Sequence, residues 1–338
     1  NYVISYKKKE TIKMAKVKNF KTIFPAVSVP LNDDYSINEP EFRAYLRWIK
    51  TFYGKGMDGL VCNGHTGEIT GLTRAERKRV VEICAEECGD VMTIISGVNC
   101  ENTAESIEMA KEAKEAGADG ILLMPPHMWL RFGMNPDAPF EYVKDVAEGA
   151  DIDIIIHLYP ATSKAFYPVE TLIKMCKEID HVKCIKMGTR VTSIYEHDVR
   201  LLRQECPDIS LITCHDETLC VSWFPGMDGA LIGFAGCVPE IICPAREVFA
   251  NPDKHTLKEA QDWSDRIYHI SQAIYGGGQP SGEAHARLKE ALKQRGIFTS
   301  ALMRKPVLPL NQEEKDWVAL GLERSQLPEV DMTQFEDK

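Results

Sequence analysis

The sequence lacks any uninterrupted apolar run close to the roughly 20 residues that a membrane-spanning helix needs, so we expect neither an integral membrane protein nor a membrane partner. It also lacks an excess of positive charge, because 50 acidic residues against 40 basic ones give a formal net charge of −10. Nucleic-acid binding normally requires a basic surface, and we therefore expect no nucleic-acid partner. The composition, 44% hydrophobic and 27% charged, is typical of a globular protein and excludes a disordered chain.

Cysteine pairs at the spacing of a zinc site are also missing. Eleven cysteines are present. Cys84 and Cys88 lie close together on an expected helix, and Cys214-His215 precedes Cys220, but neither group has a second ligand pair at zinc-finger spacing. A chain of this size needs no disulfides, and no apolar leader stretch precedes the cysteines. We therefore predict reduced core thiols in a cytoplasmic protein, and no metal site.

Charge is unevenly distributed between the two ends of the chain. Residues 1–22 hold seven Lys and one Glu, whereas residues 311–338 hold eight acidic and three basic residues. We interpret residues 1–21 as a leader or a flexible arm. Residues 305–338, which are punctuated by prolines, are interpreted as a C-terminal extension, and neither segment is assigned a function.

Between these ends, short apolar runs rich in β-branched residues alternate with helix-like stretches. The runs are Ile23–Val29, Gly59–Cys62, Met92–Ser96, Gly120–Met124, Ile152–Tyr159, Val182–Lys186, Ile209–Cys214 and Gly229–Gly233. Strand–helix alternation predicts a parallel sheet, and eight such units can close into a barrel. We therefore predict an α/β fold, a (β/α)8 TIM barrel over residues 22–239. A purely helical pattern follows and predicts a C-terminal helical appendage over residues 240–304.

Local signals agree with this scheme. Thr73 and Glu76 form a capping box, in which the two side chains satisfy two backbone amides at the start of a helix. The glycine-rich segment 276–282 separates two of the C-terminal helices. Because no strand precedes it and no Gly-Lys-Ser/Thr follows, we interpret it as a helix–helix loop and not as a phosphate-binding loop.

Lys186 is the most informative candidate, because active sites of such barrels lie at the carboxyl ends of the strands. Strand alternation places Val182, Cys184 and Lys186 on one face of the sixth strand. A lysine at the inner end of a barrel strand reaches solvent only through the barrel mouth. Burial favours its neutral form, which attacks carbonyl groups to give a Schiff base. The alternatives are a lysine paired with a buried carboxylate and a lysine that extends to the rim.

Tyr159 ends the neighbouring strand, on the same face as Ile155 and His157. If that face points inward, its phenol can move protons at a carbinolamine on Lys186. A core tyrosine with a hydrogen-bonded hydroxyl is the alternative. After the second strand, Gly64-His65-Thr66-Gly67 offers backbone amides and a hydroxyl suited to a small carboxylate, or simply a tight turn.

In combination, four motifs resemble those of the dihydrodipicolinate synthase / N-acetylneuraminate lyase family. They are Gly64-His65-Thr66-Gly67-Glu68 followed by Leu72-Thr73-Arg74-Ala75-Glu76-Arg77, the pair Tyr159 and Lys186, the segments 229–232 and 235–239, and Arg304-Lys305-Pro306. The resemblance covers about residues 22–310. It implies a class I aldolase or synthase with a barrel and C-terminal helices, assembled as a homo-oligomer, a tetramer or a dimer.

The resemblance also implies roles for individual residues. Lys186 forms a covalent imine with pyruvate or another 2-oxo acid, so that no metal or organic cofactor is needed. Tyr159 is the acid/base, and Thr66, with the backbone of His65 and Thr66, holds the substrate carboxylate. Leu231 offers its main-chain carbonyl near the substrate. The partners are thus a small 2-oxo acid and an aldehyde, which are joined or separated in a reversible aldol reaction.

Departures from the family pattern bear on the subgroup. The synthases have a hydroxyl residue in place of His65, an aromatic pair in place of His127-Met128 and an asparagine in place of Pro160. The region around Trp129 looks more like the hydratase-aldolases that cleave aryl-substituted 2-oxobutenoates (the hydroxybenzylidenepyruvate type). Trp129 then walls an apolar substrate pocket, or it packs the loop. His65 takes over the proton transfer of the missing hydroxyl, or it is an ordinary loop histidine.

Four activities therefore remain open. They are an aldolase for aryl aldehydes, a 4-hydroxy-tetrahydrodipicolinate synthase acting on pyruvate and aspartate semialdehyde, a sugar-acid aldolase or sialic-acid lyase, and a non-catalytic barrel that binds a 2-oxo acid. The intact pair of Lys186 and Tyr159 favours a lyase over the binding barrel.

Overall fold

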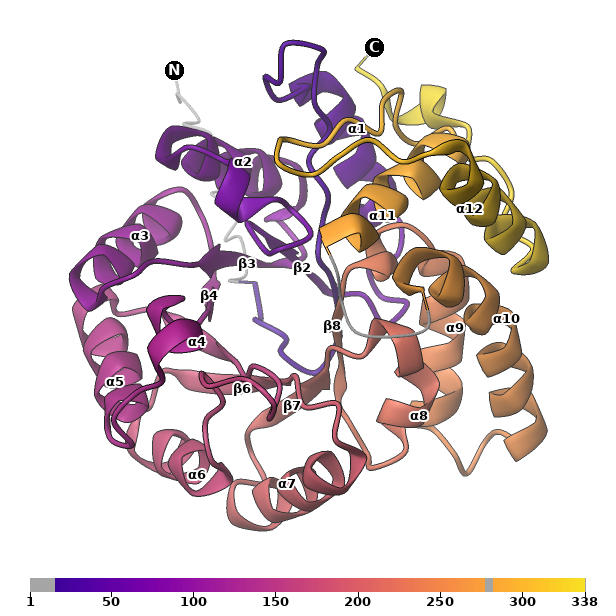
Figure 1. Cartoon of the computed structure of the whole chain (residues 1–338). Coiled ribbons are helices and arrows are strands. Elements are labelled where there is room, and N and C mark those ends of the chain that lie inside the picture. The colour runs from indigo at the N-terminus through magenta and orange to yellow at the C-terminus, as the bar shows by residue number, and fades with distance from the viewer. Residues whose placement is uncertain (1–15, 277–281, 338) are drawn as a thin grey trace, which may run out of the picture.

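A computed structural model describes residues 16–276 and 282–337. Within these ranges, eight parallel strands form one sheet in the order β1-β8-β7-β6-β5-β4-β3-β2. The strands are β1 (Ile23–Pro25), β2 (Gly59–Cys62), β3 (Thr93–Val98), β4 (Gly120–Leu123), β5 (Asp153–His157), β6 (Val182–Met187), β7 (Ser210–Thr213) and β8 (Gly229–Ile232). A parallel bridge between Ala26 and Val61 joins the two ends of this order, so the sheet closes into a barrel (Figure 1). The predicted TIM barrel is confirmed.

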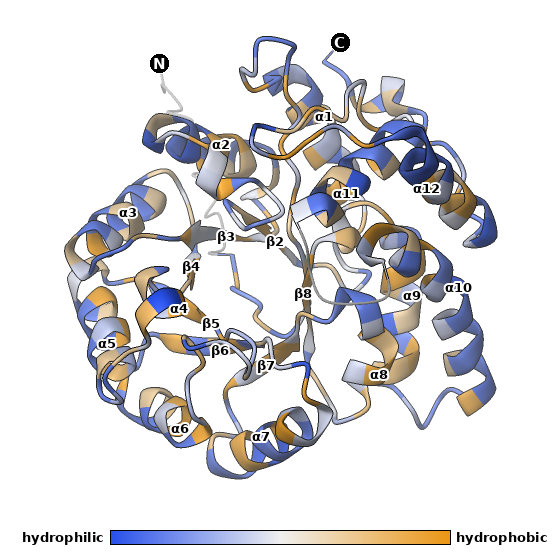
Figure 2. Cartoon of the chain, in the orientation of Figure 1, coloured by the Kyte–Doolittle hydropathy of each residue, from blue (hydrophilic) through white to orange (hydrophobic). Residues whose placement is uncertain are grey.

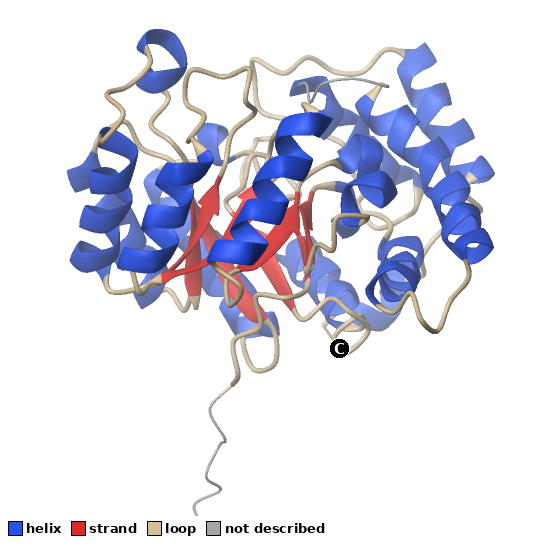
Figure 3. Ribbon diagram, turned by 90° about the horizontal axis from the view of Figure 1, so that it is seen from below, coloured by secondary structure: helices blue, strands red, loops and turns tan. Residues whose placement is uncertain are grey.

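Helices surround the strands, as the view in Figure 3 shows. They are α1 (Glu39–Lys50), α2 (Arg74–Cys88), α3 (Thr103–Glu115), α4 (Met128–Phe132), α5 (Ala138–Ala150), α6 (Val169–Glu178), α7 (Thr192–Glu205), α8 (Leu219–Trp223), α9 (Pro239–Ala250), α10 (Leu257–Tyr275), α11 (Gly282–Gln294) and α12 (Gln312–Arg324). Most of the longer helices are amphipathic, with polar residues concentrated on the outside (Figure 2). The capping box of Thr73 and Glu76 is present at the start of α2.

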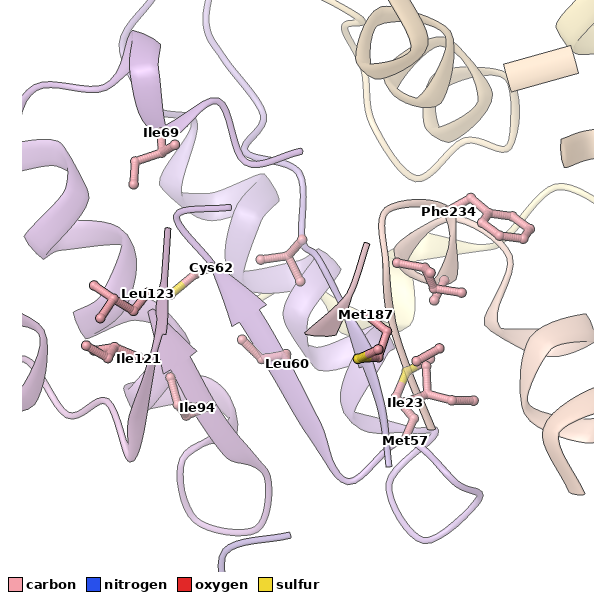
Figure 4. Close-up of a cluster of buried hydrophobic side chains, with 14 of the residues drawn as sticks. Ile23, Met57, Leu60, Cys62, Ile69, Ile94, Ile121, Leu123, Met187 and Phe234 are labelled. Atoms are coloured by element: carbon pink, nitrogen blue, oxygen red, sulfur yellow. The ribbon is translucent and has the colours of Figure 1, made fainter. Parts of the chain in front are cut away.

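The buried apolar side chains form two clusters, as expected when alternate residues of a barrel strand point inward and outward. The larger cluster lies between the strands and the helices, and Figure 4 shows part of it. The smaller cluster draws on alternate strand residues and fills the barrel, with Ile155, Cys184, Ile212 and Leu231 among its members.

The prediction that Val182 shares the inner face with Cys184 is wrong. Val182 belongs to the outer cluster and Cys184 to the inner one. The register explains this, because Ile154 pairs with Val182 while the next residue, Ile155, pairs with Cys184, so β6 carries one extra residue there. Beyond this bulge the alternation is regular, and Lys186 shares the inner face with Cys184.

The C-terminal helices cover one side of the barrel (Figure 1). Helix α12 packs against α10 and α11, so the segment that the sequence indicated only as an extension contains a further helix. Of the predicted loop over residues 276–282, residues 277–281 lie outside the described part of the chain. Residues 1–15 of the predicted arm also lie outside it. Of the rest of the arm, Lys16 forms an ion pair with Asp119.

Two expectations from composition concern the whole molecule. All eleven cysteines are free, and ten of them are buried, in agreement with reduced core thiols. Within the described ranges, no helix combines the length and the apolar character needed to cross a bilayer.

Candidate active site

A cavity of about 530 Å³ opens at the carboxyl ends of the barrel strands. The residues predicted from the sequence that line it are His65, Thr66, Tyr159, Lys186 and Leu231. Helices α10 and α11 and residues 303–307 close one side of the cavity. The barrel and the C-terminal segment therefore build this site together, and among the predicted residues Trp129 alone lies outside it.

Lys186 is the penultimate residue of β6 and projects into this cavity. In the described part of the chain, its Nζ has no hydrogen-bond or ion-pair partner. Burial lowers the pKa of the Lys186 amine, although the nearby Cys214 and Asp216 oppose the effect. The sequence left open a lysine paired with a buried carboxylate, and the structure shows an amine without such a partner. The lowered pKa favours the neutral form of this amine.

Tyr159 lies two residues beyond the end of β5, and the strand is therefore shorter than the sequence predicted. Its side chain is buried, and its Oη lies 3.4 Å from Nε2 of His65 and 3.4 Å from Nε2 of His127. Burial raises the pKa of the Tyr159 phenol above its ordinary value. The phenol is therefore protonated at neutral pH and reaches the same cavity as Lys186.

The loop after β2 presents backbone amides to the cavity. Within the described residues, the N–H groups of His65 and Thr66 donate no hydrogen bond, whereas those of Glu68 and Ile69 donate to His65 O and Gly64 O inside the turn. The Thr66 hydroxyl lies close to the backbone of Gly233, because a Cβ on that glycine would be 2.9 Å from Oγ1. Two free amides beside a hydroxyl form a concave donor site for a small anion.

Glu68 anchors this loop to the C-terminal segment. Its backbone is left-handed, with φ of 56°, and its carboxylate binds the ammonium group of Lys289 on α11. The same carboxylate accepts a hydrogen bond of 3.0 Å from the backbone N of Arg304. Because this ion pair is buried and further hydrogen-bonded, it holds the amides of the loop in a fixed position relative to the cavity.

Trp129 does not line the cavity, so the prediction that it forms an apolar substrate pocket is wrong. One argument for an aryl substrate is thereby lost. It lies on α4, and its ring packs edge-to-face on Tyr142 and Tyr167, with centroids 5.6 and 6.2 Å away. The short helix turns the indole towards these aromatic rings in the outer cluster. The alternative role stated above, packing of the loop, is the one that the structure shows.

Several residues that line the cavity were not predicted from the sequence. Asp216 follows β7, is half-buried, and accepts hydrogen bonds from Tyr275 Oη (2.7 Å) and from Phe234 N (3.2 Å). A signal for it exists in the sequence, because Cys214-His215-Asp216-Glu217 is a polar segment at the carboxyl end of a strand. Tyr275 and His285 come from α10 and α11, and no sequence pattern places those helices beside the barrel mouth.

Asp216 leads to a prediction about pH and stability. Burial raises the pKa of its carboxyl from 3.8 to about 6. Because the folded state holds the proton more tightly, this contribution to stability is complete below the unfolded pKa and is lost as the pH rises through the folded pKa. Two pKa units correspond to about 3 kcal/mol. We therefore expect Asp216→Asn, which keeps an acceptor for Tyr275, to gain up to about 3 kcal/mol over wild type between about pH 4 and pH 7.

Chemical denaturation of both proteins at several pH values measures this difference in the free energy of unfolding. Asp208→Asn, at an exposed position, is the matched control for the loss of one carboxylate. A pH-independent difference for Asp216→Asn would contradict the assignment of a raised pKa.

The barrel and the site, with an unpaired lysine, a buried tyrosine and a turn with two free amides around one cavity, define the class of this protein as an aldolase-type lyase. The comparison with protein families agrees with this class. Residues 19–324 match the model of the dihydrodipicolinate synthetase family, and the chain belongs to that family.

Individual relatives are moderately similar over most of their length. A 4-hydroxy-tetrahydrodipicolinate synthase of Bartonella bacilliformis is 26% identical over 304 residues, covering 89% of this chain and 97% of the relative. A DapA-like lyase of Pyrococcus horikoshii is 30% identical over 294 residues, covering 86% and 95%. Among solved structures, YagE of Escherichia coli K12 in complex with pyruvate superimposes with a TM-score of 0.81 at 20% identity, covering 91% of this chain and 99% of that one.

Proposed function

We propose that this protein is a lyase that forms an imine between Lys186 and pyruvate, or another 2-oxo acid, and catalyses a reversible aldol reaction with an aldehyde. The observation that carries the proposal is the unpaired Nζ of Lys186, inside a barrel cavity that it shares with Tyr159. A structural lysine at this depth normally has a carboxylate partner. The amine without one is suited to act as a nucleophile.

The reaction follows from this arrangement. The neutral amine attacks C2 of the 2-oxo acid, and the carbinolamine loses water to give an iminium. Loss of a proton from C3 gives an enamine, whose electron pair forms the new bond to the aldehyde carbon while the aldehyde oxygen gains a proton. Hydrolysis then frees Lys186, and the reverse sequence cleaves the product. Tyr159 is the group in position to transfer these protons.

Binding of the 2-oxo acid is assigned to the loop after β2. The free amides of His65 and Thr66 and the Thr66 hydroxyl provide three hydrogen-bond donors in one turn. A carboxylate is the complementary acceptor. Leu231, on β8, also lines the cavity, and its main-chain carbonyl is assigned a place near the substrate. The iminium supplies the electron sink, so the proposed reaction uses no metal and no organic cofactor.

For the aldehyde, the cavity favours an oxygenated substrate over an aryl one. The residues that line the cavity with Lys186 include His157, Arg190 and Asp216, whereas Trp129 lies outside it. Polar walls lose hydrogen bonds to water when they bind an apolar ring. Aspartate semialdehyde and hydroxylated aldehydes, the substrates of the synthase and sugar-acid alternatives, are therefore ranked above benzaldehydes.

A panel of aldehydes tests the proposal. We expect pyruvate to be consumed in the presence of aspartate semialdehyde or a hydroxylated aldehyde, at least about ten times faster than with benzaldehyde, since one lost hydrogen bond to a buried polar group costs about 1–3 kcal/mol. Pyruvate consumption and product formation can be followed by NMR. Faster turnover of benzaldehydes would favour the aryl-aldehyde aldolase over the other activities. No turnover with any aldehyde would favour the non-catalytic barrel that binds a 2-oxo acid. The homo-oligomeric state and the cytoplasmic location stay predictions.

A further inference from the structure

Lys186 has a neighbour on each adjacent strand, and the two neighbours differ in polarity. The register pairs its Cα with that of Ile212 on β7 and with that of His157 at the end of β5. His157 lies two residues beyond Ile155 on the inner face of the barrel, and it lines the cavity together with Lys186. A polar side chain therefore stands beside Lys186 on the β5 side and an apolar one on the β7 side.

A structural role alone does not explain a histidine at this position. The inner cluster below it contains apolar side chains such as Ile155 and Ile212, and an apolar residue would continue that packing. His157 is instead 7% exposed, and its Nδ1 is enclosed by protein with no hydrogen-bond partner among the described residues. A buried polar atom without a partner destabilises the folded state. This cost is explained if the same ring binds a ligand through its other nitrogen.

The enclosed nitrogen also indicates which tautomer of His157 is present. A neutral imidazole carries one N–H donor and one acceptor nitrogen. A buried N–H without an acceptor is rarer than a buried acceptor without a donor, so Nδ1 carries the lone pair and Nε2 carries the proton. Because Nδ1 is enclosed, a ligand in the cavity meets the ring through its Nε2–H.

The rings around His157 hold the imidazole in place without using this donor. Its centroid lies 4.9 Å from that of Tyr159, in an edge-to-face contact, and 5.6 Å from that of His65. In the described part of the chain, the phenol of Tyr159 contacts the nitrogens of His65 and His127 instead. The Nε2–H of His157 is therefore available to a substrate oxygen.

Charge also suits His157 to this role. Burial, followed by the nearby Lys186, lowers the pKa of His157 well below its ordinary value, so the ring is neutral at physiological pH. A neutral donor adds no second positive charge beside the amine of Lys186. A fixed N–H stabilises an oxygen that gains negative charge, because it needs no reorganisation during the reaction.

We propose that the Nε2–H of His157 donates a hydrogen bond to the C2 oxygen of the 2-oxo acid while Lys186 attacks. The Nζ electron pair forms the N–C2 bond, and the C=O π pair moves to the oxygen. A proton passes from the nitrogen to this oxygen and gives the carbinolamine. A second proton, supplied by Tyr159, lets the oxygen leave as water while the nitrogen pair forms the C=N bond. His157 keeps its own proton throughout, and the inference rests on the proposed function.

Timed quenching with borohydride after mixing with pyruvate measures the rate of imine formation alone. We expect His157→Leu to slow this rate by about 10- to 100-fold, at or below the usual effect of removing one donor to a developing oxyanion. The pyruvate concentration that gives half the maximal rate should change little, because the carboxylate is assigned to the amides of His65 and Thr66. A wild-type rate in His157→Leu would overturn the inference.

Further variants separate the hydrogen bond from a structural role. His157→Gln keeps an N–H donor close to the position of Nε2 and should recover most of the lost rate. His157→Leu should unfold at the wild-type temperature or above, because it removes an unpartnered buried nitrogen. His255→Leu is the matched control and should form the imine at the wild-type rate, since His255 precedes α10 and contacts Glu259 outside the cavity. A His157→Gln protein as slow as His157→Leu would contradict the proposed donor.

The pH dependence distinguishes a hydrogen bond from proton transfer by His157. Because the ring stays neutral, the slowing in His157→Leu should be the same at about pH 6 and about pH 8, and a factor that changes with pH would indicate proton transfer and overturn the proposed role. No adduct in the wild type would remove the proposed function. An adduct on wild-type Lys186 that forms equally fast in His157→Leu would remove this inference alone, and so would a His157→Leu protein slowed only in the aldol step.

Discussion

Replacing Lys186 with alanine is expected to reduce turnover by at least about 10⁴-fold, to the level of any residual solution reaction. The amine is the nucleophile in the proposed mechanism, and no other lysine lines the inner part of the cavity among the described residues. Substrate binding by the amides of His65 and Thr66 should survive, because these groups do not depend on Lys186. The loss should therefore appear in kcat far more than in the affinity for pyruvate.

The same strand offers a matched control for this variant. Lys183 is exposed and donates to the carbonyl oxygen of Asp180. Lys183→Ala should keep wild-type turnover. A third variant, Lys186→Met, tests folding, and it should unfold at the wild-type temperature or above because it removes a desolvated, unpaired amine. An active Lys186→Ala protein, measured beside these controls, would contradict the imine mechanism.

Replacing Tyr159 with phenylalanine is expected to slow turnover by about 10²- to 10⁴-fold, the usual contribution of a general acid–base group. The ring keeps its packing, but the hydroxyl that transfers protons to and from the substrate is lost. Imine formation should become slow without being abolished, since the amine of Lys186 is intact. Turnover and the rate of borohydride trapping, measured on the same preparation, report the two effects separately.

Tyr167→Phe is the control for the loss of a buried phenol. Tyr167 is fully buried against Trp129 and lies outside the cavity, so its variant should retain the wild-type rate. A Tyr159→Phe protein that is no slower than Tyr167→Phe would remove Tyr159 from the acid/base role.

Periodicity explains why most of the barrel was predictable from the sequence. Apolar runs separated by amphipathic helices located all eight strands, and the ends of the runs located Lys186, because side-chain direction alternates along a strand. The bulge that moves Val182 to the outer cluster was not predictable, since one extra residue in β6 leaves no mark in the hydrophobic pattern.

The remainder of the site depends on contacts between distant segments. Tyr275 and His285 enter the cavity only because α10 and α11 pack beside the barrel. Trp129 was misplaced for the same reason, because its direction is set by Tyr142 and Tyr167 and not by its neighbours in sequence. Local patterns identify residue types, whereas three-dimensional packing decides which of them meet.

The central claim is that Lys186 forms a covalent imine with a 2-oxo acid. Incubation of the protein with pyruvate and sodium borohydride, followed by proteolysis and peptide mass spectrometry, tests it directly. We predict one reduced pyruvate per chain, located on the peptide that contains Lys186, and no adduct without pyruvate or in Lys186→Met. An unmodified Lys186, or an adduct confined to other lysines such as Lys183 or Lys305, would contradict the account.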